Sequence, residues 1–211
     1  MRPRTWPTLC ACVALLGLFL WATVGLTRGL EHWTFEELRR DDARQGRLVA
    51  PPIEIRGADG TTRALWTGAD RSVYLLDFIY ATCPTLCQAL GSEYARMQAQ
   101  LLAAPPGAAA PKLLSLSFDL ERDGRDALAA YAKLHGADAR VWRVAAPLTR
   151  AGRDALLARL GVVVVPDGFG GYVHNGSILV VDGGGTVRGV FELAQWQDAL
   201  AAARRLSEAA S

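Results

Sequence analysis

The chain opens with a long apolar segment that contains no charged side chain. This segment runs from Thr5 to Thr27 and is bounded by Arg4 and Arg28. As a helix it would span ~34 Å, which is enough to cross the ~30 Å hydrocarbon core of a bilayer. Because Arg2 also precedes it, the positive-inside rule keeps the N-terminus cytoplasmic and exports the rest of the chain.

Two interpretations of this segment remain open: an uncleaved membrane anchor and a cleaved signal peptide. A signal peptide usually has a shorter apolar region followed by an A-x-A-like cleavage site. Ala22-Thr23-Val24 is a poor version of such a site, which favours the anchor. In both cases the residues from about 30 onward lie outside the cytoplasm, in a compartment that permits disulfides.

The exported part alternates between helix and strand patterns of apolar residues. A capping box at Thr34-Phe35-Glu36-Glu37 predicts a short polar helix over residues 35–45. Further along, strands are predicted at 53–56, 64–66, 73–80, 113–119, 141–145, 177–181 and 186–191, and helices at 84–102, 125–135, 150–160 and 194–207. The glycine-rich segment 166–176 is expected to be irregular.

The order of these elements predicts the fold. Strand–helix–strand units imply right-handed crossovers and a parallel sheet portion, with hairpins at the two ends. We therefore predict an α/β protein, a thioredoxin-like sandwich with an N-terminal β-hairpin, preceded by one transmembrane helix. The predicted parts are a membrane anchor or signal segment at 1–28, a juxtamembrane helix and linker at 29–50, and the thioredoxin-like domain at 51–211.

Composition excludes some classes of protein. The 211 residues include 23 basic and 21 acidic side chains, a net charge of +2. A nucleic-acid binder would show a strong basic excess, so no nucleic-acid partner is expected. Four cysteines are too few for a disulfide-dense scaffold. Cys10 and Cys12 lie in the apolar segment as small apolar residues, which leaves Cys83 and Cys87 as the exported thiols.

Cys83 and Cys87 follow directly after the apolar run 73–80. Pro84 suits the first position of a helix, so Cys83 is the predicted N-cap, where the helix dipole lowers the pKa of a thiol. Three residues separate the cysteines, whereas thioredoxin-type oxidoreductases usually carry C-x-x-C. At i and i+4 on a helix, two sulfurs can close a disulfide or hold one soft metal ion, and thiolates select Cu(I).

A third ligand is sought among the exported histidines, His32, His135 and His174. His32 is close to the membrane segment, and His135 at the end of a helix suits a capping or surface role. His174 precedes the strand at 177–181. In a thioredoxin-like sheet the loop before this strand approaches the cysteine helix, so we expect His174 to complete a copper site with the two thiolates.

Several motifs, in this order, resemble the Sco/SenC family of copper proteins. They are Thr82-Cys83-Pro84-Thr85-Leu86-Cys87, Ser117-Phe118-Asp119-Leu120-Glu121-Arg122-Asp123, Ala130-Tyr131-Ala132-Lys133-Leu134-His135-Gly136, and Val173-His174 before Ser177-Ile178-Leu179-Val180-Val181-Asp182. The second of these resembles the family's S-x-D-P-E-R-D segment. The resemblance spans about 50 to 205, and the single N-terminal apolar segment also fits it.

The resemblance implies that Cys83, Cys87 and His174 bind copper, with Asp119 as an acid near the site. Cu(I) would be held trigonally, and Cu(II) would need an added weak ligand that the sequence does not identify. The resemblance further implies an inner-membrane protein with its C-terminal domain in the periplasm or an equivalent space. Three positions depart from the family pattern without removing a ligand: Gln88, Leu120 and Val173.

Two functions of different classes follow. The first is a copper chaperone that delivers copper to the copper-accepting subunit of a respiratory oxidase, as in cytochrome c oxidase assembly, or to a similar membrane protein. The second is a membrane-tethered thiol–disulfide oxidoreductase, with Cys83 as nucleophile and Cys87 as resolving thiol. Simple dithiol exchange does not require His174, which favours the chaperone; a thioredoxin-superfamily peroxidase is a third alternative.

Asp77 and Asp119 are interpreted as strand-end hydrogen-bonding residues.

Overall fold

The computed structural model describes residues 6–68, 71–83, 86–105 and 110–210, without the side chains of residues 86–89. Two compact units divide the chain, Met1–Asp41 and Asp42–Ser211. The domain boundaries predicted from the sequence remain predictions. Residues just before position 51 are already part of the second unit. Ala50 N–H donates to Gly185 O at 2.8 Å, and Val187 N–H donates to Leu48 O at 2.9 Å.

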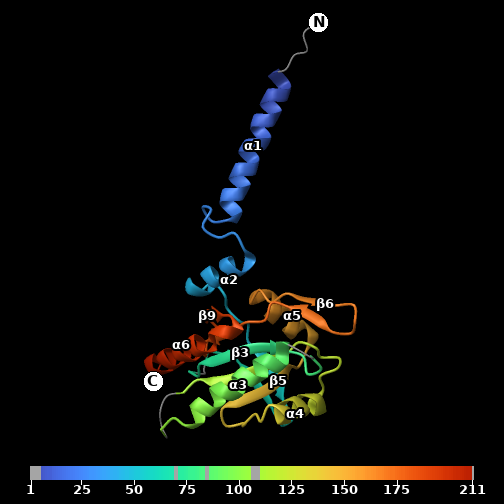
Figure 1. The fold of residues 1–211 in the computed structure, drawn as a ribbon, viewed down its shortest axis with the longest axis vertical. Helices are drawn as coiled ribbons and strands as arrows, with labels where there is room; N and C mark the ends of the chain where they lie inside the picture. The colour runs from blue at the N-terminus through green and yellow to red at the C-terminus, as the bar shows by residue number, and fades with distance from the viewer. Residues whose placement is uncertain (1–5, 69–70, 84–85, 106–109, 211) are drawn as a thin grey trace. The chain divides into compact units, whose positions relative to one another are not determined.

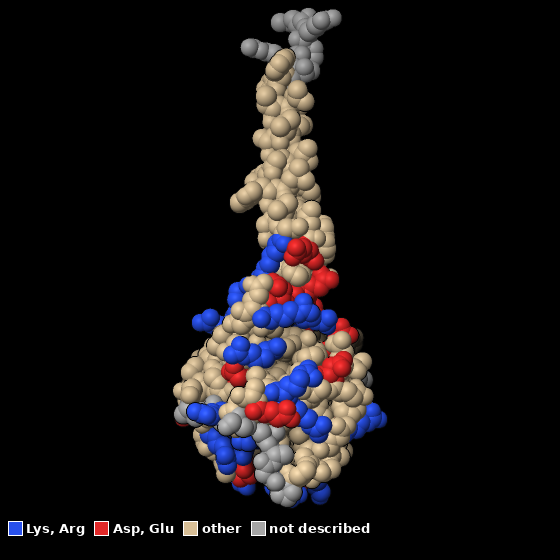
Figure 2. All heavy atoms as spheres, turned by 90° about the vertical axis from the view of Figure 1, so that its left-hand side faces the viewer, with Lys and Arg blue, Asp and Glu red and all other residues tan. Residues whose placement is uncertain are grey.

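The first unit contains the helix α1, Trp6–Leu26, which has no charged residue. Its surface in Figure 2 shows neither Lys or Arg nor Asp or Glu. The helix is long and apolar enough to cross a membrane, a property that anchors and signal sequences share. A second helix, α2 (Phe35–Arg44), begins with the expected capping box, since Glu37 N–H donates to Thr34 Oγ1 and Thr34 N–H donates to Glu37 Oε2, both at 3.1 Å.

The second unit is built on a seven-stranded sheet (Figure 1). Its strands lie in the order β2-β1-β5-β4-β3-β8-β9. β3, β4 and β5 are parallel, and the outer strands add antiparallel neighbours on both sides. The strands are β1 (Ile53–Gly57), β2 (Thr62–Leu65), β3 (Tyr74–Ile79), β4 (Lys112–Ser117), β5 (Trp142–Pro147), β8 (Ile178–Val181) and β9 (Val187–Phe191). The predicted α/β fold, with a hairpin before the parallel portion, is confirmed.

Helices pack on both faces of this sheet. They are α3 (Leu86–Leu102), α4 (Arg125–Leu134), α5 (Arg150–Arg159), the 3₁₀ turn η1 (Leu193–Gln195) and α6 (Trp196–Ala209). Tyr94 of α3 and His135 at the end of α4 both pack against the Trp142 ring, at centroid distances of 5.6 and 6.3 Å. α5 approaches β1 on the opposite face, where Gly152 lies beside Ile53. All six residues of β3 are buried in this core, as the continuous apolar run predicts.

The expectation of an irregular segment at 166–176 is wrong. β6 (Val164–Pro166) and β7 (Tyr172–His174) form an antiparallel hairpin, which lies beside the main sheet in Figure 1. Asp167 Oδ1 accepts the N–H groups of Phe169 at 2.7 Å and Gly171 at 2.9 Å, which folds the turn. Gly170, at φ +91°, supplies the left-handed backbone that a tight turn needs. The glycines therefore shape a turn, and the short strands beside them were too brief to be recognised.

Candidate metal centre

Cys83 lies in the turn that follows β3, four residues after Ile79, the last residue of the strand. Its N–H donates to Tyr80 O at 3.1 Å, which closes a turn, and the residue is only 5% exposed. Cys87 belongs to α3, but its side chain lies outside the described residues. Pro84 also lies outside them, so the N-cap role of Cys83 and the pairing of the two sulfurs stay predictions.

The loop after β4 lies beside the cysteine loop, because parallel strands end at the same edge of the sheet. Asp123 joins the two loops through one carboxylate oxygen, Oδ2. This atom accepts the Ala81 N–H at 2.7 Å and the Ser117 hydroxyl at 2.5 Å. Burial raises the pKa of Asp123, and the two hydrogen bonds oppose this rise. The backbone two residues before Cys83 is thus held by a buried acid.

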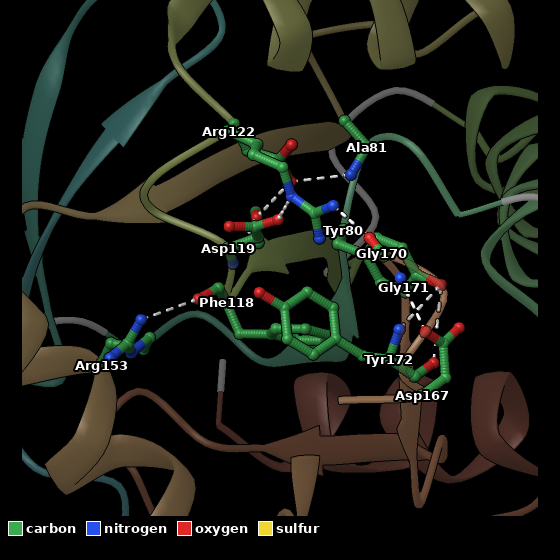
Figure 3. A network of polar contacts seen from close by, with 12 residues as sticks. Tyr80, Ala81, Phe118, Asp119, Arg122, Arg153, Asp167, Gly170, Gly171 and Tyr172 are labelled. Carbon is green, nitrogen blue, oxygen red and sulfur yellow. Dashed lines mark hydrogen bonds and ion pairs between the residues drawn. The ribbon is translucent and has the colours of Figure 1, made fainter. Parts of the chain in front are cut away.

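Arg122 connects the loop after β4 to the β6–β7 hairpin (Figure 3). Its guanidinium donates to Asp119 Oδ2 and to the Gly170 carbonyl in the hairpin turn. It also lies over the Tyr172 ring, 5.1 Å from the centroid, and 6.0 Å from the centroid of Tyr80. The hairpin is therefore attached to the sheet by hydrogen bonds and by cation–π contacts through one side chain.

Four rings fill the space between the cysteine loop and the hairpin. Phe118 is central, with its centroid 5.6 Å from Tyr80, 5.4 Å from Tyr172 and 5.2 Å from His174. Tyr80, three residues before Cys83, also accepts the Tyr172 N–H at its hydroxyl, at 3.4 Å. The cluster thus forms a continuous packed path from the turn that holds Cys83 to the imidazole of His174.

His174 is buried, with 9% of its surface exposed. Neither ring nitrogen has a hydrogen-bond partner among the described residues. Burial lowers the pKa of His174, because a charged imidazolium would be poorly solvated there. A neutral imidazole with an unshared electron pair is the form that binds metals. Buried polar groups normally form a hydrogen bond or bind a metal, so these two nitrogens are expected to interact with a bound group.

The strand partner and the following residue hold His174 in place. His174 pairs with Val164 across the hairpin. Next to it, Asn175 Oδ1 accepts the Val163 N–H at 2.7 Å and Asn175 Nδ2 donates to Gly161 O at 2.9 Å. The hairpin end is therefore fixed to the segment after α5 as well as to Arg122.

Comparison with known proteins identifies the family. The SCO1/SenC family model matches residues 58–209, most of the chain. The chain belongs to the SCO1/SenC family. No curated protein matches the sequence.

Solved Sco structures share the fold at low sequence identity. The SCO1/SenC family lipoprotein from Bacillus anthracis is 17% identical with a TM-score of 0.66, over 76% of this chain and 96% of that one. BsSco, described as a member of the Sco family of cytochrome c oxidase assembly proteins, is 19% identical with a TM-score of 0.65, over 77% and 95%. Copper-bound ScoI from Bradyrhizobium japonicum is 20% identical with a TM-score of 0.60, over 75% and 99%.

In this Sco-family chain, the structure describes the side chains of Cys83, Asp119 and His174 but not that of Cys87. The aromatic cluster links the Cys83 turn to His174, while the Asp119 carboxylate is 3% exposed and pairs with Arg122. Within the described ranges, no three His, Cys, Asp or Glu side chains are grouped so as to hold a metal ion. Since the Cys87 side chain is outside those ranges, the three-ligand set remains a prediction.

Of two interpretations made from the sequence, one is confirmed and one is wrong. His135 is the C-cap of α4, as expected, and its half-buried ring packs against Tyr131, 4.5 Å between centroids. Asp77 is not at a strand end. It lies inside β3, fully buried, opposite Ser115 in β4.

Sequence reasoning also missed Arg122, Asp123, Tyr80 and Tyr172. The first two belong to the Ser117–Asp123 motif, but only Asp119 of that motif was singled out as a site residue. The two tyrosines gave no signal, because aromatic residues at strand ends are common in any core.

Proposed function

We propose that this protein is a membrane-anchored copper chaperone that delivers copper to a respiratory oxidase copper site. In this proposal Cys83 and Cys87 bind Cu(I) as thiolates and His174 binds it as a neutral imidazole. Soft thiolates suit Cu(I), and a trigonal set of three ligands leaves the ion open to a partner's ligands. Copper is the cargo, so transfer proceeds by exchange of these ligands for those of the acceptor.

The observation that carries the proposal is the state of His174. Both of its ring nitrogens are buried and have no hydrogen-bond partner in the part of the chain that the structure describes, and the ring lies at the end of an aromatic cluster that begins beside Cys83. If His174 only filled space, an apolar side chain could take its place without leaving buried polar nitrogens unsatisfied. A metal ion satisfies one nitrogen and accounts for the polar side chain.

Family membership supports the same function. Among its structural relatives, the ScoI proteins of Bradyrhizobium japonicum and Arabidopsis thaliana are described with copper bound. BsSco is described as belonging to a family of cytochrome c oxidase assembly proteins. The apolar helix α1 supports tethering to the inner membrane, with the second unit in the periplasm or an equivalent space.

Copper titration of the reduced full chain in a non-ionic detergent tests the ligands. We expect one Cu(I) per chain, with affinity lowered at least a hundredfold in Cys83→Ala and Cys87→Ala and at least tenfold in His174→Ala. His135→Ala is the matched control, because His135 is also partly buried and its Nε2 atom has no hydrogen-bond partner among the described residues. Equal affinity of His174→Ala and His135→Ala would exclude His174 as a ligand.

One observation favours the thiol–disulfide oxidoreductase as a second candidate. Asp77 lies in the strand that leads to Cys83, and burial raises its pKa to about 7. A carboxyl that titrates near neutral pH can take up the proton of a thiol that it reaches directly or through one water molecule, and the oxidoreductase requires that Asp77 reach Cys83 in this way. The Cys83 thiolate would attack a target disulfide, and Cys87 would resolve the mixed disulfide, leaving the target reduced and this chain oxidised.

A target disulfide peptide distinguishes the two candidates. The chaperone predicts copper binding that depends on His174, with slow peptide reduction. The oxidoreductase predicts rapid reduction that is unchanged in His174→Ala and slowed in Asp77→Asn. In cells, full oxidase activity after deletion of the protein under copper limitation would contradict the assembly role.

A further inference from the structure

A recess of about 220 Å³ lies at the end of the sheet opposite the cysteines. It opens where β3 and β4 begin, at Tyr74 and Lys112, whereas Cys83 follows the other end of β3. The six residues of β3 span roughly 17 Å, so the whole strand lies between the recess and the turn that carries Cys83. It is lined by Arg63, Leu65, Tyr74, Lys112, Leu113, Leu114, Ala139, Arg140, Val141 and Arg143.

Strand register places cationic and apolar side chains on one face here. Tyr74 pairs with Lys112 and Leu114 pairs with Arg143. Because side chains alternate along a strand, Lys112 and Leu114 point to the same face. Leu65 and Leu114 are buried, while Arg63 and Lys112 are exposed. The recess thus has an apolar floor and a rim of four cationic side chains.

The positive charge of this rim is only partly neutralised. Arg140 pairs with Asp138 at 2.5 Å, and Arg143 lies 3.7 Å from Asp59. Arg63 and Lys112 form no ion pair in the described part of the chain, although the charge of Arg63, like that of Arg143, helps to lower the pKa of Asp59. The Lys112 ammonium donates instead to the hydroxyl of Ser72 at 2.8 Å. Two positive charges in excess therefore face one small recess.

We propose that this recess binds a phosphate group, carried by an anionic phospholipid or by a soluble phosphate compound. Cations gathered on a low-dielectric floor repel one another, and a multivalent anion removes that repulsion. Guanidinium groups bind phosphate oxygens by paired hydrogen bonds, and a lysine adds a point charge. The apolar floor accommodates the glycerol or acyl carbons next to such a group. Nothing in this site depends on copper.

Binding to the full chain in non-ionic detergent tests the proposal. The soluble probes are inorganic phosphate and glycerol 3-phosphate, measured by calorimetry at low ionic strength. The lipid probe is short-chain phosphatidylglycerol, with phosphatidylcholine of the same chain length as reference. Arg63→Gln and Lys112→Gln remove the unpaired cations. Their matched controls are Arg159→Gln and Lys133→Gln, exposed cations elsewhere on the domain.

We expect saturable binding that weakens at least tenfold in Arg63→Gln and Lys112→Gln and less than twofold in the two controls. Lys112→Arg, which keeps the charge, should retain binding. Binding of the soluble probes identifies a soluble ligand, and binding of phosphatidylglycerol alone identifies a lipid headgroup. The proposal is overturned if no probe binds, or if the control variants lose as much affinity as the recess variants.

Discussion

The Arg122 guanidinium donates to the Gly170 carbonyl, so a side chain from the loop after β4 holds the turn of the hairpin that carries His174. The same guanidinium binds Asp119. The acid singled out from the sequence is therefore a partner of the residue that positions the hairpin. In the structure, Asp119 is linked to the hairpin that carries His174 through Arg122.

Removing Arg122 should loosen the hairpin and weaken the histidine's part in copper binding. Arg122→Ala removes two hydrogen bonds and the cation–π contacts with Tyr80 and Tyr172. We expect copper affinity to fall about threefold to tenfold, in the same direction as His174→Ala but less. The Cu(II) electron paramagnetic resonance spectrum should show nitrogen coupling that is weakened or heterogeneous.

Arg96→Ala is the control for Arg122→Ala, because Arg96 is an exposed arginine that pairs with Glu93 of its own helix. In an Arg122→Ala, His174→Ala double variant the two effects should not add, since both act through one ligand. Additive losses would show that Arg122 does not act by positioning His174.

The buried carboxyl of Asp77 should make stability depend on pH. Burial raises its pKa to about 7, and interactions with the Ser115 and Tyr94 hydroxyls offset this only in part. The folded state therefore binds the proton more tightly than the unfolded state, in which an aspartate titrates near ~4. The contribution of Asp77 to stability is therefore largest below pH ~4 and falls as the pH rises to about 7, by on the order of 4 kcal/mol.

Asp77→Asn tests this assignment because the amide does not titrate. Urea unfolding of the full chain in detergent, followed by circular dichroism, should show a much flatter dependence between pH 4 and 7. Above pH 7 the variant should be the more stable protein. Asp198→Asn, an exposed acid in α6, should leave the wild-type slope intact. A wild-type slope in Asp77→Asn would assign the pH dependence to other groups.

Some features of this fold are encoded locally and others only in three dimensions. The apolar run of β3 and the motif around Cys83 mark a buried strand followed by the turn that carries Cys83. The hairpin of β6 and β7 was missed because three-residue strands give too little alternation, and their pairing depends on the Asp167 turn. Residue spacing alone could not indicate that Arg122 reaches Gly170, 48 positions away.

The burial of individual polar residues also could not be predicted from the sequence. Asp77 sits in an apolar run and was interpreted as a strand-end residue, yet it lies fully inside the sheet. His135 ends an amphipathic helix, yet α3 approaches it at Gly91. Each outcome depends on which neighbouring element covers the residue, a property of the packing and not of the local pattern.

The close approach of α3 to His135 should make Gly91 intolerant of a side chain. A Cβ atom at Gly91 would lie 2.4 Å from Cε1 and 2.6 Å from Nε2 of His135. Gly91→Ala should therefore destabilise the protein by about 1–3 kcal/mol, despite the better helix propensity of alanine. In a His135→Ala background the clash is gone, and the same change should stabilise by up to about 1 kcal/mol. Thermal unfolding of the four proteins in this cycle measures the change of sign.

Asp123 should control the order of the cysteine loop. In Asp123→Ala the Ala81 N–H and the Ser117 hydroxyl lose their common acceptor, and buried unsatisfied groups cost about 1–3 kcal/mol each. Hydrogen exchange of the Ala81 amide should become at least tenfold faster, whereas exchange within α6 should change only by the loss of global stability. Asp126→Ala, an exposed acid three residues later, should change neither. Unchanged protection of Ala81 in Asp123→Ala would mean that the strand end, and not this carboxylate, holds the turn before Cys83.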